Sequence, residues 1–389
     1  MKINKWTLAL AAAGVVSLPS GTTAEEKPNQ VLTALSNTTL SGYVDTSAHW
    51  NPGTGNANPA PYAFNAGKQD GFNLDSVVLQ IQKPISEGDW GAGYTAMLMF
   101  GPDATGVNGS SGEYVREAHV DLHTPLGNGL DFQMGRFGNL IGWESTTSYV
   151  NPNYTHSYAW SIQPTEHTGI LGTYKFCDTL SASAGVANEV TTGPINEKSQ
   201  TESKKAIVSL ITYTAPEKWG FLKGSTFNVG LDTGPGTGDP DKSRTQLYVG
   251  TTMKTPIERL SVGAEYDSIW HTDVAGEDTG YGMNAVGYLM YKLSEKATFN
   301  LRGEYARGAY LGALADANNG TTDNPLTKVF ALTGTLQYDF WANVISRLEV
   351  RWDHAVNGKD AFGGDGGTGS SEPDKKNEYT IAANIIYKF

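Results

Sequence analysis

The chain has 389 residues and a formal net charge of −12, and it contains 46 glycines, 19 tyrosines and a single cysteine, Cys177. One thiol excludes a disulfide framework and a thiolate metal cluster. The acidic balance argues against nucleic acid as a partner, because binding to phosphates requires a basic surface.

The N-terminus predicts an export signal. Lys2 and Lys5 precede an apolar run from Trp6 to Leu18, and small residues follow up to Ala24, an order typical of secretory signal peptides. The run is too short to span a bilayer as a helix, and no later run is long enough. Without the two lysines the net charge is −14. We expect a signal peptide, a short periplasmic segment and a folded barrel at residues 1–24, 25–38 and 39–389.

Alternating segments fill the rest of the chain. Each has about ten residues, apolar on one side and bounded by turn residues, as expected of β-strands. About sixteen are found, an even number. They lie at 39–50, 72–83, 90–101, 114–124, 130–137, 167–177, 179–189, 204–215, 225–233, 244–255, 258–270, 280–293, 297–308, 327–340, 343–354 and 377–389.

Short and long links alternate between these segments. Outer-membrane barrels have short periplasmic turns and long outer loops, whereas a propeller would repeat at a fixed period. The predicted fold is therefore all-β, a transmembrane antiparallel up-and-down β-barrel of about 16 strands. The long links are 51–71, 102–113, 138–166, 190–203, 234–243, 271–279, 309–326 and 355–376.

Tryptophans support this arrangement. Aromatic rings favour the two membrane interfaces, so a barrel should carry a belt of them at each end of its strands. Three tryptophans lie beside short links and three near long links, respectively Trp90, Trp219 and Trp341, and Trp50, Trp270 and Trp352.

Charged residues gather on one face of several predicted strands. Leu348 and Val350 oppose Arg347 and Arg351, for example. Unpaired charges are too costly for a packed core, and a barrel of about sixteen strands is wide enough to hold water. The charged faces therefore predict a water-filled lumen.

The longest link, 138–166, is unusually rich in aromatic residues and includes Glu144, Tyr154 and Tyr158. A loop of this length is usually functional. We expect it to fold into the lumen and narrow the pore; the alternative is a surface loop that packs on its neighbours.

Charged residues on the predicted inner face are candidates for ion selection. Arg302, Arg347 and Arg351 are expected to face acidic residues across the pore, with Lys292 beside them. Opposed charges of this kind set ion preference, although local cross-strand ion pairs are the alternative. The acidic candidates are Glu117, Asp121, Glu144, Glu265 and Asp267.

Other chemistry is weakly indicated. His119 and His123 are no zinc pair on a strand, because four residues span ~13 Å, and no serine lies in a recognisable nucleophile context. Clustered aspartates in 232–241 and 360–374 suit Ca²⁺ or simply a solvated loop. We predict no catalytic residue, no cofactor and no resident metal.

The last strand ends on an aromatic residue. Its apolar face includes Tyr379, Ile381, Ile385, Tyr387 and Phe389, the C-terminal residue. Alternation that runs to an aromatic C-terminus resembles the closing strand of an outer-membrane barrel.

Three motifs lie between residues 138 and 170: Gly138, Gly142 and Glu144; Asn151, Pro152, Asn153, Tyr154, Ser157 and Tyr158; and Pro164, His167, Thr168, Gly169 and Ile170. These motifs resemble the putative β-barrel porin-2 (OmpL-like) family of bacterial outer-membrane proteins. The opening segment 40–45, Leu-Ser-Gly-Tyr-Val-Asp, is also similar to that family, and the strand layout agrees across nearly all of the mature chain. The resemblance implies an outer-membrane porin and carries over no catalytic residue.

The expected function is passive diffusion of small hydrophilic solutes and ions across the outer membrane, with weak cation preference. The alternative is a binding or structural barrel, such as an adhesin or a sheath for a periplasmic partner. Expected partners are outer-membrane lipid, lipopolysaccharide and solutes, and a homotrimer is expected by resemblance to sixteen-stranded porins.

Overall fold

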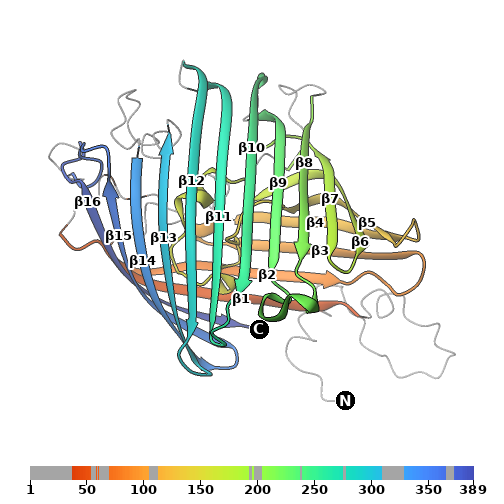
Figure 1. The fold of residues 1–389 in the computed structure, drawn as a ribbon, viewed down its shortest axis with the longest axis horizontal. Coiled ribbons are helices and arrows are strands. Elements are labelled where there is room, and N and C mark those ends of the chain that lie inside the picture. The colour runs from red at the N-terminus through yellow and green to blue at the C-terminus, as the bar shows by residue number, and fades with distance from the viewer. Residues whose placement is uncertain are drawn as a thin grey trace, which may run out of the picture.

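The structure is a computed structural model that describes residues 37–53, 58, 60, 70–104, 113–191, 195–196, 204–236, 239–274, 277–308, 328–364 and 372–389. Sixteen antiparallel strands form one closed barrel, in which each strand pairs with its neighbours in sequence and β1 pairs with β16 (Figure 1). The predicted all-β up-and-down barrel is confirmed. The expected signal peptide and most of the segment 25–38 lie outside the described residues.

The strand bounds agree with the sequence pattern within a few residues over most of the barrel. The strands are β1 (Thr39–Trp50), β2 (Gly71–Lys83), β3 (Gly91–Phe100), β4 (Glu113–Thr124), β5 (Leu130–Gly138), β6 (Glu166–Cys177), β7 (Leu180–Ala187), β8 (Ala206–Thr214), β9 (Thr226–Gly236), β10 (Asp239–Lys254), β11 (Leu260–Val274), β12 (Glu277–Lys292), β13 (Ala297–Gly308), β14 (Lys328–Trp341), β15 (Val344–Ala355) and β16 (Asn377–Lys388).

Two predicted long loops are wrong. The segments 234–243 and 271–279 are largely strand, because β9 and β10 reach Gly236 and Asp239, and β11 and β12 reach Val274 and Glu277. These hairpins stand highest at the upper end of the barrel in Figure 1. A strand that projects beyond the apolar layer needs no apolar face, so the alternation that marks a membrane strand stops before the strand does. The proposed Ca²⁺ loop 232–241 is thus mostly strand as well.

Residues of β1 and the C-terminus close the barrel. Gly42 and Phe389 exchange two backbone hydrogen bonds of 3.0 Å each, N–H to C=O in both directions. A Cβ at position 42 would lie 2.1 Å from the carbonyl oxygen of Val78, so only glycine fits there. The C-terminus consequently lies at the end of the barrel that carries the short turns (Figure 1).

The two faces of the strands differ as predicted. On β14, Phe330, Leu332 and Leu336 are exposed, whereas Thr333 and Thr335 are fully buried. Exposed tryptophans occur at both ends of the strands, with Trp90, Trp219 and Trp341 beside short turns and Trp50 and Trp270 near the other end. The outer face is therefore an apolar band between two aromatic belts, and the polar face points inward.

Besides strands, the described residues contain the short helices η1 (Ser148–Val150), α4 (Tyr158–Ile162) and η2 (Glu217–Leu222). Within the described part of the chain, no helix has the length and apolarity to cross a membrane.

Apolar side chains inside the barrel form four small clusters rather than one core. Each cluster contains or contacts a residue of the link between β5 and β6, namely Tyr158, Tyr149, Leu140 or Trp143. This link, residues 139–165, is called the lumen loop below. Its aromatic residues obtain their apolar contacts from the inner wall.

Candidate functional site: a loop held across the barrel lumen

The lumen loop contacts strands that lie far from its own ends. Tyr154 Oη donates to Ser47 Oγ in β1 at 2.9 Å. The backbone N–H of Trp143 donates to Glu265 Oε2 in β11 at 3.0 Å, and Asn300 Nδ2 in β13 donates to the Pro152 carbonyl at 2.7 Å. Because these partners are buried side chains on the inner face of three separate strands, the loop lies inside the barrel and not on its outer surface.

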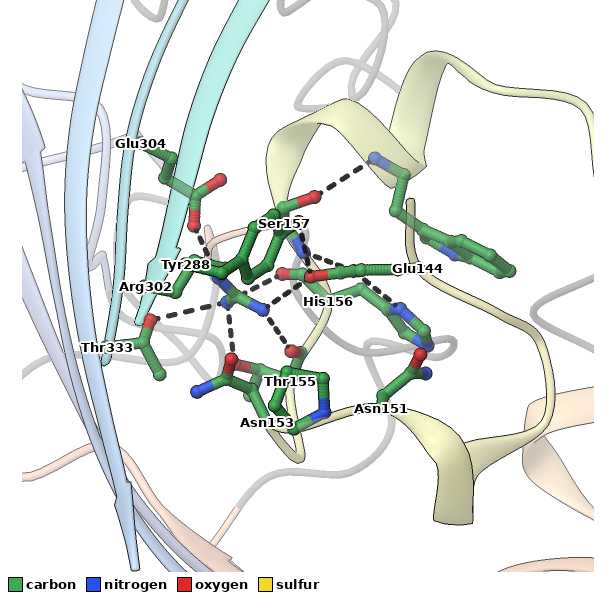
Figure 2. A network of polar contacts seen from close by, with 12 residues as sticks. Glu144, Asn151, Asn153, Thr155, His156, Ser157, Tyr288, Arg302, Glu304 and Thr333 are labelled. Carbon is green, nitrogen blue, oxygen red and sulfur yellow. Dashed lines mark hydrogen bonds and ion pairs between the residues drawn. The ribbon is translucent and has the colours of Figure 1, made fainter. Parts of the chain in front are cut away.

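Arg302 of β13 holds the middle of the loop (Figure 2). Its Nη1 lies 2.9 Å from Glu144 Oε1, and its Nη2 donates to the carbonyl oxygen of His156 at 3.1 Å. The same guanidinium donates to the carbonyl and hydroxyl of Thr155, and Nε donates to Glu304 Oε1 at 3.1 Å. Nη2 also donates to the hydroxyl of Thr333 in β14 at 3.3 Å. A guanidinium has five N–H donors in a fixed plane, and here they join two wall strands to the loop main chain.

Arg347 and Arg351 of β15 bind the same loop. Arg347 donates to the carbonyls of Asn153 and Ser148 at 2.8 and 2.6 Å. Arg351 donates to the His156 carbonyl at 2.6 Å and pairs with Asp353 at 2.8 Å. The three arginines are 0–3 % exposed. They lie on the inner wall as expected, but the loop covers them, so they do not face open water.

Wall carboxylates bind the loop amides in the same way. Glu349 accepts hydrogen bonds from the backbone N–H groups of Tyr154 and Thr155 at 2.6 and 2.9 Å. Glu304 accepts one from Tyr158 at 2.6 Å. Arginines thus satisfy loop carbonyls and glutamates satisfy loop N–H groups, as buried backbone groups require.

The sequence analysis missed Glu304 and Glu349 as loop partners. Their signal was present, since each stands two residues after an arginine on the same strand face. The pair Arg351–Asp353 repeats that spacing, and like Arg302–Glu304 it joins two residues of one strand. The charged groups of the wall therefore form ion pairs along a strand, and the same groups also hold the loop.

Glu144 is the acidic centre of the loop. It is buried and contacts Arg302, the Nδ1 of His156 at 2.9 Å, and the hydroxyl of Tyr288, which donates at 3.1 Å. Burial alone would raise the pKa of Glu144, but Arg302, His156 and the N–H of Ser157 together lower this pKa to about 2. The carboxylate is therefore ionised throughout the neutral range.

Packing complements these polar contacts. The ring of Trp143 stacks on Tyr288 with centroids 3.8 Å apart, and His156 stacks on Trp160 at 4.2 Å. A Cβ on Gly263 would lie 2.7 Å from the Trp143 ring, so the glycine makes room for the indole. The loop is thus complementary to the inner wall in shape as well as in charge.

Of the other candidates, Glu265 accepts from the same Tyr288 hydroxyl as Glu144, at 2.7 Å, whereas those that follow lie apart from Glu144. Tyr158 is buried among apolar wall residues. Glu117 and Asp121 lie on β4 with His119 and do not join the arginines. Lys292 is exposed beside a short turn, not beside the arginines. Among the described residues, no group of three or more His, Cys, Asp or Glu side chains is arranged to hold a metal ion.

Comparisons with known proteins agree with this fold. A family model described as "Putative beta-barrel porin-2, OmpL-like" matches residues 37–389. A comparison with curated protein sequences finds no match.

Solved structures of bacterial porins are similar in fold. They include an anion-selective porin from Comamonas acidovorans (TM-score 0.58, 12 % identity, 90 % of this chain and 99 % of that one). The trimer form of OmpT from Vibrio cholerae gives the same four values. The outer-membrane channel DcaP of Acinetobacter baumannii has a TM-score of 0.56 and 13 % identity over 90 % of this chain and 97 % of that one.

Proposed function

The chain belongs to the putative beta-barrel porin-2, OmpL-like family, and from this premise we propose that it is a passive diffusion channel for small hydrophilic solutes and ions. The lumen loop narrows its pore. The family and the fold are those of an outer-membrane porin; the absence of enzymatic activity remains a prediction from the sequence.

The observation that carries the proposal is the loop across a polar lumen. A purely structural barrel has no need of a segment held by charged groups on β11, β13 and β15. A channel needs such a segment, because a fixed obstruction in a wide barrel sets the size of the solute that passes.

Deleting Asn151–Trp160 with a short Gly/Ser bridge tests the proposal. Single-channel conductance in a planar bilayer should rise, while heat-modifiable migration shows that the barrel still forms. A matched control removes 272–279 from the β11–β12 hairpin, which shortens two paired strands equally. The control should leave conductance unchanged. A folded wild-type barrel without conductance would favour the adhesin or sheath alternative.

Three further features belong to the same proposal. Residues 1–24 act as the export signal to the outer membrane, and the exposed aromatic belts contact lipid and lipopolysaccharide. The protein forms a homotrimer, as OmpT from Vibrio cholerae does in its trimer form. Light scattering in mild detergent measures the mass of the assembly; a monomeric mass would contradict the trimer.

A further inference from the structure

The lumen loop leaves one sector of the inner wall open to water. On β13 to β15 the inward side chains Asn300, Thr335 and Glu349 are buried and contact the loop. On β4, Arg116 still donates to Thr147 of the loop at 3.1 Å. Nearer the short turns of β4 to β7, inward side chains such as Gln133 and Thr173 are only half-buried, and their hydrogen bonds join wall to wall. Examples are Gln133 to Asp121 at 3.1 Å and Thr173 to Ser183 at 2.8 Å.

Four titratable residues of β4 lie on this open sector: three adjacent ones described next, and His123 closer to the short turn, which pairs with Asp131 of β5 at 2.5 Å. Glu117, His119 and Asp121 alternate with Ala118, Val120 and Leu122, which are exposed on the outer face. The side chains of Glu117 and Asp121 retain 21 % and 13 % of their exposure and that of His119 between them retains 3 %, whereas Arg302 retains none. The acidic groups therefore reach the lumen water that the arginines do not reach.

His119 lies between the two carboxylates. Its Nε2 is 3.5 Å from Glu117 Oε2, and its Nδ1 is 3.0 Å from Asp121 Oδ1. Its neighbours across the sheet, Thr95 on β3 and Gly135 on β5, carry no charge.

The nearest cations are Arg116, on the inward side of β4 itself, and Arg136 of β5. Arg116 and Arg136 lie 3.3 and 3.7 Å from Glu166, with which they pair. The charge that His119 meets is thus that of its two acidic neighbours.

We propose that Glu117, His119 and Asp121 form the charge filter of this channel, and that His119 makes its cation preference depend on pH. This inference rests on the proposed channel function. With neutral His119 the three residues carry two negative charges, and with protonated His119 they carry one. Histidine is the side chain that titrates near neutral pH, and charges beside a narrow aqueous path determine which ions concentrate there.

The test measures the reversal potential across a KCl gradient between pH 5 and pH 8. In the wild type, the K⁺ to Cl⁻ permeability ratio should rise by about twofold to fourfold with pH, because one nearby charge is lost from the pore wall. His119→Gln should abolish that rise and keep the high ratio at every pH. The double variant Glu117→Gln/Asp121→Asn should lower the ratio at pH 8 toward one.

Two control substitutions remove the same types of titratable side chain at positions outside the open sector. His354→Gln removes an imidazole from the outward face of β15, and Asp178→Asn removes an acid from an exposed turn. Neither should change the profile. A conducting His119→Gln channel that retains the wild-type pH dependence would contradict the proposed charge filter but not the proposed channel function. A folded wild-type protein that does not conduct would contradict the channel function itself.

Discussion

Arg302 shows how a single side chain can fix a loop of many residues. It donates to the Thr155 and His156 carbonyls and pairs with Glu144 and Glu304, all without exposure to solvent. Its charge is therefore matched by partners from both the loop and the wall. Removing it would leave two buried carboxylates with less compensation, which is more costly than the loss of any one hydrogen bond.

Arg302→Met should therefore release the loop. Losing one partner of a buried ion pair costs about 3–5 kcal/mol, enough to populate undocked loop conformations. We expect larger and noisier single-channel currents and a lower urea midpoint of unfolding. Arg307→Met, on the exposed end of the same strand, is the control and should change neither. Wild-type currents in a folded Arg302→Met channel would contradict the role given to this residue.

Glu144 gives the docked loop a pH limit. Its pKa is lowered from 4.5 to about 2, so its stabilisation is fully present above pH 4.5 and is lost as the pH falls toward 2. The shift corresponds to ~3 kcal/mol of docking free energy. At high salt, which screens the charges of the wall, wild-type conductance should stay constant from pH 7 to pH 4.5 and rise as acidification approaches pH 2. The Glu144→Gln channel should already have a higher conductance than the wild type at pH 7. A rise in wild-type conductance centred on pH 4.5 would show that Glu144 is not paired.

At the scale of elements, the strands follow directly from alternation, because bilayer and water impose opposite demands on the two faces. Alternation does not predict the ends of β9 to β12, because there the strands project beyond the apolar layer and no longer need one apolar face. Alternation also tells which face Arg302 or Arg347 occupies but not what covers that face. The covering segment is far away in sequence, since Arg347 binds the carbonyl of Asn153. Aromatic content placed the loop inside the barrel, yet its wall contacts required the structure.

The fit between the loop and β11 gives a prediction about packing alone. Gly263→Leu would push against the Trp143 ring, because a Cβ there already lies 2.7 Å from it. We expect the loop to move and the conductance to rise, with no change in charge. Gly287→Leu on β12 is the matched control, since the closest atom to its Cβ is 4.0 Å away. Equal conductance in both variants would mean that Trp143 does not hold the loop.

At the scale of the whole molecule, closure removes every free strand edge. Each of the sixteen strands has a partner on both sides, and the β1–β16 pairing joins residues more than three hundred positions apart. Most links at one end are short, so neighbouring strands pair by local hairpins and only this last pairing is distant. With no edge from which the ladder can fray, the barrel should resist detergent until it is heated.

The protein should therefore be heat-modifiable. Unboiled in mild detergent it should migrate differently from the boiled form, and its circular dichroism spectrum should be rich in β-structure, because every strand of the closed barrel is paired on both sides. Deleting Asn377–Phe389 removes β16 and leaves β1 and β15 with open edges, so that variant should migrate identically before and after boiling. A helical spectrum from the full chain would contradict the barrel. A heat-modifiable truncated variant would show instead that closure through β16 is not what resists the detergent.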